Sequence, residues 1–211
     1  MRHVKITDGK SQTKGGMQWG ENITHEITIP GNELCTNQVL HGYYDEYVAV
    51  FMNPIHGNYN SETMQLWECN GKKVADDGTK LGFKGQTTIK QIPIPVITME
   101  QRTEIAILVS MKVYKEKSYI KWTRKWLSGK DRTETVARAA VWAVWAATEA
   151  AWATEAAWAA EAAWAAATAA ESAAESAAES AAWSAAWSAA TAARAAEKLS
   201  KIIQLVLNKG G

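Results

Sequence analysis

Five side chains between positions 41 and 56 could form a binding site for a small polar ligand: His41, Tyr43, Tyr44, Asn53 and His56. Histidine accepts or donates a proton near neutral pH, and tyrosine and asparagine supply further hydrogen-bonding groups. Glycine and aromatic neighbours place both histidines in loop-like surroundings. The alternative is that these groups only make local hydrogen bonds within loops. The sequence leaves both interpretations open, a ligand pocket or a set of structural loop residues, and favours the second.

Three acidic or nucleophilic residues offer weaker chemistry. Asp76 and Asp77 could bind a cation, but Gly78 follows them directly, which is typical of a tight turn. Cys35 has no histidine and aspartate close in sequence to activate it as a nucleophile. The chain contains no phosphate-binding glycine loop, no paired-cysteine spacing and no histidine-rich metal motif. We therefore predict no catalytic residue, no metal and no cofactor. The sequence favours a binding protein over an enzyme, and both interpretations stay open.

A run of basic residues lies between positions 112 and 125, interleaved with Tyr114, Tyr119 and Trp122. The basic residues are Lys112, Lys115, Lys117, Lys121, Arg124 and Lys125. Such a pattern could contact nucleic acid, but it also fits the solvated face of two short helices. The formal net charge of the whole chain is only +1, which argues against a general polyanion binder. We expect a solvated face and no nucleic-acid partner.

Short strands and turns must position the candidate site. Asn22–Ile29 alternates apolar and polar residues, as a half-buried strand does. Asp45 can cap a helix that ends at Asn53-Pro54, although a strand is an alternative there. Met64–Cys69 favours a strand, and Asn70-Gly71 is a strong hairpin signal, so the return strand should begin at residue 74. A second turn is expected at residues 76–78, and the prolines at 93 and 95 should end strand structure.

Helical signals begin at Thr98, which forms a capping-box pattern with Gln101. Ser118 can cap a second short helix, and Gly129 is well placed as its carboxyl-terminal cap. These signals predict an α+β fold, with a small mixed-sheet domain and packed helices in residues 1–130. Residues 131–211 form a second, Ala/Trp-rich helical region.

Alanine dominates this second region, with 34 of the 60 residues from 137 to 196. Alanine has the highest helix propensity, so we expect either one long helix or a folded-back bundle. A reversal would fall most naturally at Ala167–Ser172, where the regularly spaced tryptophans stop. A passive arm that is simply tolerated because it stays helical is a third possibility.

Tryptophans occur on two faces of this predicted helix, which a solitary rod in water would expose. The predicted packing and assembly residues are Trp142, Trp145, Trp152, Trp158, Trp164, Trp183, Trp187, Leu199 and Ile203. The region should therefore pack against its own folded-back segment or against another copy of the chain, and we expect a homo-oligomer. No membrane span is expected, because glutamate and serine recur throughout the run. The chain shows no signal-peptide pattern, so Cys35 and Cys69 should be reduced thiols in a cytoplasmic protein.

Several blocks of the chain resemble a family of bacteriophage and prophage proteins with no assigned activity. The blocks are Leu40–Tyr43, Ala49–His56, Leu66–Glu68, Asp76–Lys80, Ile92–Pro95 and Trp126–Gly129. In that family a small mixed domain also precedes an Ala-rich repeat, and the resemblance spans about residues 19–200. It implies a phage origin and action in a bacterial host cytoplasm. The small domain also resembles, more faintly, ADP-ribosyltransferase-like folds, although that family's catalytic glutamate has no counterpart here.

Three functions are compatible with these observations. The first is a phage-type interaction protein that binds a bacterial protein, such as a defence factor that it inhibits, and self-associates through its helical region. The second is a small-molecule or nucleotide-binding protein, or an ADP-ribosyltransferase-like domain, that uses His41 and His56. The third is a structural component of a virion.

Overall fold

The computed structural model describes residues 1–28, 31–135, 137–138, 141, 156–174, 180, 183–188 and 199–208. The chain divides into two compact units, unit 1 from Met1 to Val96 and unit 2 from Ile97 to Gly211. Composition instead placed the boundary at residue 130. The difference arises because the helix at residues 99–113 packs with helices of the Ala-rich region, and the helix at residues 117–127 packs with the helix at residues 99–113, so both belong to unit 2.

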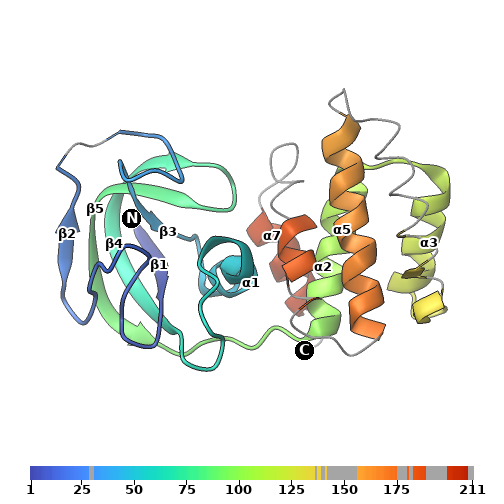
Figure 1. The fold of residues 1–211 in the computed structure, drawn as a ribbon, viewed down its shortest axis with the longest axis horizontal. Coiled ribbons are helices and arrows are strands. Elements are labelled where there is room, and N and C mark those ends of the chain that lie inside the picture. Colours follow the sequence, from blue (N-terminus) through green and yellow to red (C-terminus); the bar gives the residue numbers. More distant parts are fainter. Residues whose placement is uncertain are drawn as a thin grey trace. The chain divides into compact units, whose positions relative to one another are not determined.

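Unit 1 contains a five-stranded antiparallel sheet, which confirms the predicted mixed α+β class (Figure 1). Its elements are β1 (Arg2–Thr7), β2 (Thr24–Glu26), β3 (Leu40–Gly42), α1 (Glu46–His56), β4 (Gln65–Asp76) and β5 (Leu81–Ile92). The strand order is β1-β4-β5-β2, and β3 also pairs with β5. A bridge between Val4 and Tyr43 links β1 to the residue after β3. The apolar centre is a cluster of Trp19, Leu40, Leu81 and Phe83.

The long hairpin of β4 and β5 corrects one prediction. Asn70-Gly71 does not form a turn, and no return strand begins at residue 74, because β4 continues to Asp76. The register shifts on both sides of this pair, and a Cβ atom on Gly71 would lie 2.7 Å from the carbonyl oxygen of Gly85. Gly71 thus permits a close approach between the strands. The turn predicted at residues 76–78 is confirmed, since Gly78 has a φ of +85° and the hairpin reverses there.

Helix α1 begins as predicted but ends later. The Asp45 side chain accepts a hydrogen bond from the backbone N–H of Val48 at 2.9 Å, which confirms the N-cap. The helix does not stop at Asn53-Pro54 but continues to His56. Proline removes only one backbone hydrogen bond this close to the end of the helix. Burial of the residues from Val48 to Met52, all at most 4 % exposed, offsets that loss.

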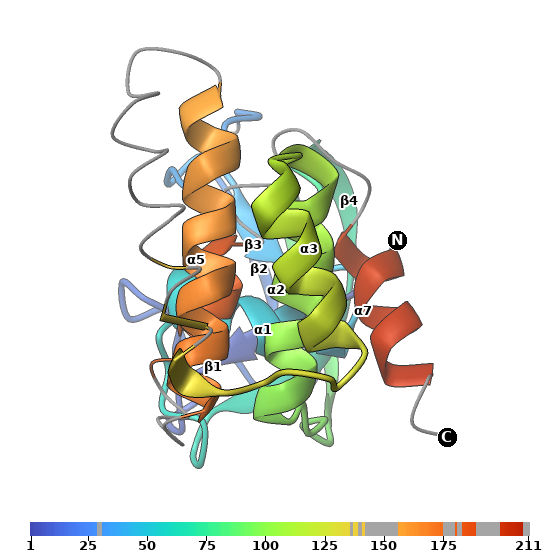
Figure 2. The same ribbon diagram turned by 90° about the vertical axis from the view of Figure 1, so that its right-hand side faces the viewer.

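Unit 2 is helical in the part that the structure describes. Its main elements are α2 (Met99–Val113), α3 (Lys117–Leu127), α5 (Ala156–Ala174) and α7 (Leu199–Leu207). Helix α2 packs against α3, α5 and α7, and it lies between α5 and α7 (Figure 2). None of the described helices is long and apolar enough to cross a membrane.

The capping predictions for α2 and α3 have mixed outcomes. The capping box of Thr98 and Gln101 is confirmed, with both hydrogen bonds present. Ser118 is not the N-cap of α3, because the side chain of Glu116 accepts from the N–H groups of Ser118 and Tyr119 and so starts the helix two residues earlier. Gly129 has a φ of +71° just after α3, and its N–H donates to the carbonyl of Trp126, as the predicted glycine cap requires.

One straight helix is excluded for the Ala-rich region by its own contacts. The hydroxyls of Ser172 and Ser180 are 3.0 Å apart, and the Trp187 indole donates to Glu161 at 3.0 Å. Along a straight helix these pairs would be about 12 Å and about 39 Å apart. The reversal predicted at Ala167–Ser172 is wrong, because α5 continues through it to Ala174.

The predicted packing residues have different environments. Trp142, Trp145 and Trp152 lie outside the described residues, as does the side chain of Trp158. Trp164 is half-buried. Trp183 is 42 % exposed and stacks on Trp187, with ring centroids 5.4 Å apart. Leu199 and Ile203 are buried on α7, which packs against α2.

Candidate functional site

The five residues of the predicted ligand site lie on β3, α1 and the segment between them. The structure brings three of them together. The rings of Tyr43 and His56 stack with centroids 5.8 Å apart, and His41 is close enough to influence the charge of His56. Tyr44 contacts the β4–β5 turn, and Asn53 contacts the segment after α1. The predicted group is therefore one cluster of three residues with two outlying members.

The two clustered histidines are neutral at pH 7. Burial lowers the pKa of His41 to about 4 and that of His56 to about 3, and the nearby Lys80 ammonium lowers both further. The Nδ1 atom of His56 is buried without a hydrogen-bond partner among the described residues. Burial also raises the pKa of the Tyr43 hydroxyl. Folding therefore disfavours the charged forms of His41, His56 and Tyr43.

Asn53 is occupied by a structural role. Its side-chain amide donates to the carbonyl of Tyr59 at 2.8 Å, and its carbonyl accepts from the N–H of Tyr59 at 3.1 Å. These two bonds tie the end of α1 to the segment that leads into β4. This is the local hydrogen bonding that the structural interpretation of the sequence describes.

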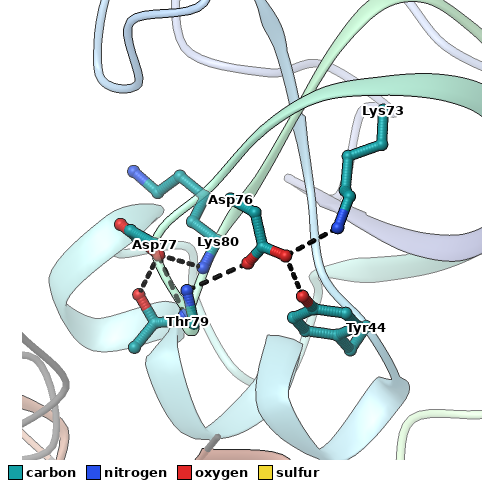
Figure 3. Close-up of polar contacts among 7 residues, drawn as sticks. Tyr44, Lys73, Asp76, Asp77, Thr79 and Lys80 are labelled. Atoms are coloured by element: carbon teal, nitrogen blue, oxygen red, sulfur yellow. Dashed lines mark hydrogen bonds and ion pairs between the residues drawn. The ribbon is translucent and has the colours of Figure 1, made fainter. Parts of the chain in front are cut away.

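The two aspartates of the β4–β5 turn are also engaged (Figure 3). Asp77 Oδ1 accepts from the backbone N–H groups of Thr79 and Lys80 and from the Thr79 hydroxyl, at 2.6–2.9 Å. Asp76 accepts from Lys73 at 2.7 Å, from the N–H of Gly78 at 3.0 Å and from the Tyr44 hydroxyl. Burial acts to raise the pKa of Asp76, but these hydrogen bonds outweigh it and lower the pKa below its usual value.

The sequence left open that these two aspartates bind a cation, which would require further side-chain ligands around them. No group of three or more His, Cys, Asp or Glu side chains is arranged to hold a metal ion in the described part of the chain. The carboxylates of Asp76 and Asp77 instead accept hydrogen bonds from backbone N–H groups of the turn, as acidic residues in tight turns commonly do.

Sequence reasoning missed the partners of Cys35. The Cys35 backbone N–H donates to His41 Nε2 at 3.1 Å, and the Lys80 ammonium donates to Cys35 Sγ at 3.3 Å. Lys80 is 45 positions away in sequence, so local spacing carries no sign of the contact. The pairing of Gly42 with Leu81 places the start of β5 beside β3. A correctly placed hairpin would have indicated that Lys80 lies near His41.

Unit 2 contains a second candidate site, a groove of about 640 Å³ along α3. Its lining residues are Lys115, Lys117, Ile120, Lys121, Arg124, Lys125, Ser128 and Lys130. Six of these eight residues are cationic, and none of the six forms an ion pair with another described residue. The groove is therefore an open cationic surface, here called the α3 groove.

The opposite face of α3 holds the aromatic residues. Tyr119, Trp122 and Trp126 are 2 %, 7 % and 3 % exposed, and the Tyr119 hydroxyl lies 2.6 Å from the Ser110 hydroxyl of α2. The basic and aromatic residues that alternate in the sequence are thus separated onto two faces of one helix. The aromatic face anchors α3 to unit 2, and the basic face stays exposed.

Comparisons with protein-family models, with curated proteins and with solved structures give no match to this chain.

Proposed function

We propose that this chain is an interaction protein that binds an acidic surface of a partner protein through the α3 groove. The observation that supports this proposal is that six cations line one groove and form no ion pair with the residues that the structure describes. Exposed charges of one sign attract a complementary surface and accelerate its association. Residues 112–130 carry seven basic residues and one acidic residue, although the whole chain carries only +1.

A protein partner fits the α3 groove better than a nucleic acid does. Proteins that bind single strands stack bases on exposed aromatic rings, but Tyr119, Trp122 and Trp126 are buried. Helix α3 has 11 residues and is about 16 Å long, which limits the number of phosphates it could contact. The resemblance to phage proteins makes a bacterial host protein the class of partner we propose, bound in the host cytoplasm.

The proposal is tested by capture from a nuclease-treated bacterial lysate with the full-length chain as bait. The variant Lys121→Glu/Arg124→Glu/Lys125→Glu reverses three exposed charges of the groove. The matched control Lys14→Glu/Lys72→Glu/Lys84→Glu reverses three exposed charges of unit 1. Each protein captured by the wild-type chain is identified, purified and titrated against all three baits at two salt concentrations.

We expect a purified acidic protein whose affinity for the control equals that for wild type. The α3 variant should lose at least about tenfold in affinity, and added salt should weaken the wild-type complex. Equal affinity for the α3 variant would overturn the proposal. Capture seen from an untreated lysate but lost on nuclease treatment would identify nucleic acid as the occupant instead.

Self-association is the second part of the proposed function, and Trp183 supports it. This residue is 42 % exposed and stacks on Trp187, which leaves part of an apolar pair in contact with water. We expect sedimentation velocity to show an oligomer that Trp183→Ser shifts toward monomer. A wild-type chain that sediments as a single monomeric species would contradict the proposed self-association. That result would not bear on the proposed binding of a partner at the α3 groove.

A further inference from the structure

Cys35 combines an exposed thiol with a fixed backbone. The residue is exposed, and its φ of +63° lies in the left-handed region that residues with a side chain rarely adopt. The hydrogen bond from its N–H to His41 Nε2 at 3.1 Å holds that conformation. The neighbouring Leu34 and Val39 lie against Gly82 of β5, since a Cβ atom there would meet them at 3.1 and 3.2 Å. The sulfur is therefore presented from an anchored position.

Lys80 brings a cation to this sulfur. Its side chain is on a residue only 7 % exposed, and among the described residues the one acceptor of its ammonium is Cys35 Sγ at 3.3 Å. A buried ammonium is costly unless a negative group compensates it. Asp77 Oδ1 is occupied by hydrogen bonds from backbone N–H groups of the turn. Cys35 Sγ is the acceptor that this ammonium faces, and burial lowers the pKa of the nearby His41 and His56.

We propose that Cys35 is a modification site that forms mixed disulfides with low-molecular-weight disulfides, and that Lys80 is its positioning residue. The Cys35 thiolate attacks one sulfur of the incoming disulfide. The old S–S bond breaks, its electron pair leaves with the second sulfur as a thiolate, and a new S–S bond joins Cys35 to the first sulfur. The incoming disulfide is itself the oxidant, and a free thiol reverses the step.

Cys69 provides an internal comparison within the same chain. It lies on β4 with 0 % exposure, and its thiol donates to the carbonyl of Trp67 at 3.5 Å. Burial raises the pKa of this thiol to about 12. Reaction at Cys69 in the native protein therefore requires opening of unit 1, and its protection reports that the fold is intact.

The experiment follows release of thionitrobenzoate when the full-length native chain reacts with 5,5′-dithiobis(2-nitrobenzoate). We expect one rapid equivalent, mapped to Cys35 by peptide mass, and a second equivalent only after unfolding. Lys80→Met should slow the rapid reaction by about tenfold or more. Lys80→Arg should restore most of the rate. Lys84→Met, which removes an exposed lysine of β5, the strand that begins directly after Lys80, should leave the rate unchanged.

A second measurement uses no Lys80 variant, so its result does not depend on whether such a variant folds correctly. In the Cys69→Ser background, the rate of Cys35 in the native chain is compared with its rate in the unfolded chain at the same pH. A native rate several-fold higher supports the proposal. A native rate equal to or below the unfolded rate overturns it, as does a Lys80→Met rate equal to wild type while Cys69 stays protected.

Discussion

In unit 1 the ionisable groups around β3 are withdrawn from water, whereas in unit 2 the basic groups of α3 face it. Lys5 and Lys80 are 4 % and 7 % exposed, and each donates to a group of unit 1. The lysines and the arginine of the α3 groove have no charged partner among the described residues. Cationic side chains are thus buried inside unit 1 and exposed on the surface of unit 2.

This contrast separates where charge affects folding from where it affects binding. Burial lowers the pKa of Lys5 to about 8 and that of His3 to about 4, so folding works against their charged forms. All four histidines of the chain lie in unit 1. Stability that depends on pH should therefore reside in unit 1, and binding that depends on salt should reside in unit 2.

Replacing His56 should produce the largest change in the pH dependence of stability. The pKa of His56 falls from 6.5 in the unfolded chain to about 3 in the folded chain. Below pH 6.5 the unfolded state binds a proton that the folded state does not, so stability falls as pH falls from 6.5 toward 3. At pH 4 the penalty is on the order of 3 kcal/mol. His56→Phe keeps a ring beside Tyr43 and should remove that penalty.

The measurement is the free energy of unfolding in urea at pH 7 and at pH 4 for wild type and His56→Phe. The loss on acidification should be smaller in the variant. Tyr43→Phe is the control, because it alters the same stack without changing a group that titrates in this range. Equal losses in wild type and His56→Phe would show that this buried histidine does not make unit 1 acid-sensitive.

The contrast also explains which features the sequence could predict. Asp45 as an N-cap, the Thr98–Gln101 capping box and the turn at Gly78 are each encoded within about four residues. Their physical cause is local backbone hydrogen bonding, which short sequence patterns record. Each of these features was predicted correctly from the residues alone.

Features that depend on register between distant segments were not predictable in this way. Asn70-Gly71 favours a turn locally, but pairing with β5 extends the strand through it. The contact of Lys80 with Cys35 depends on the same hairpin. In the Ala-rich region, Ser172 and Ser180 meet although the repeat offers many equivalent positions. Uniform small side chains carry little information about which residues pack together, so the path of this region could not be read from spacing.

The smallest expected effect concerns the stability of unit 2. Lys121, Arg124 and Lys125 are exposed and have no ion-pair partner among the described residues, so folding gains little from their charge. Exposed substitutions of this kind usually change the free energy of unfolding by no more than about 0.5 kcal/mol. The triple reversal to glutamate should therefore melt close to wild type in thermal denaturation followed by circular dichroism, even where it abolishes partner binding. A loss of several kcal/mol would instead mean that these cations hold α3 in place, and the division between internal charge in unit 1 and external charge in unit 2 would fail.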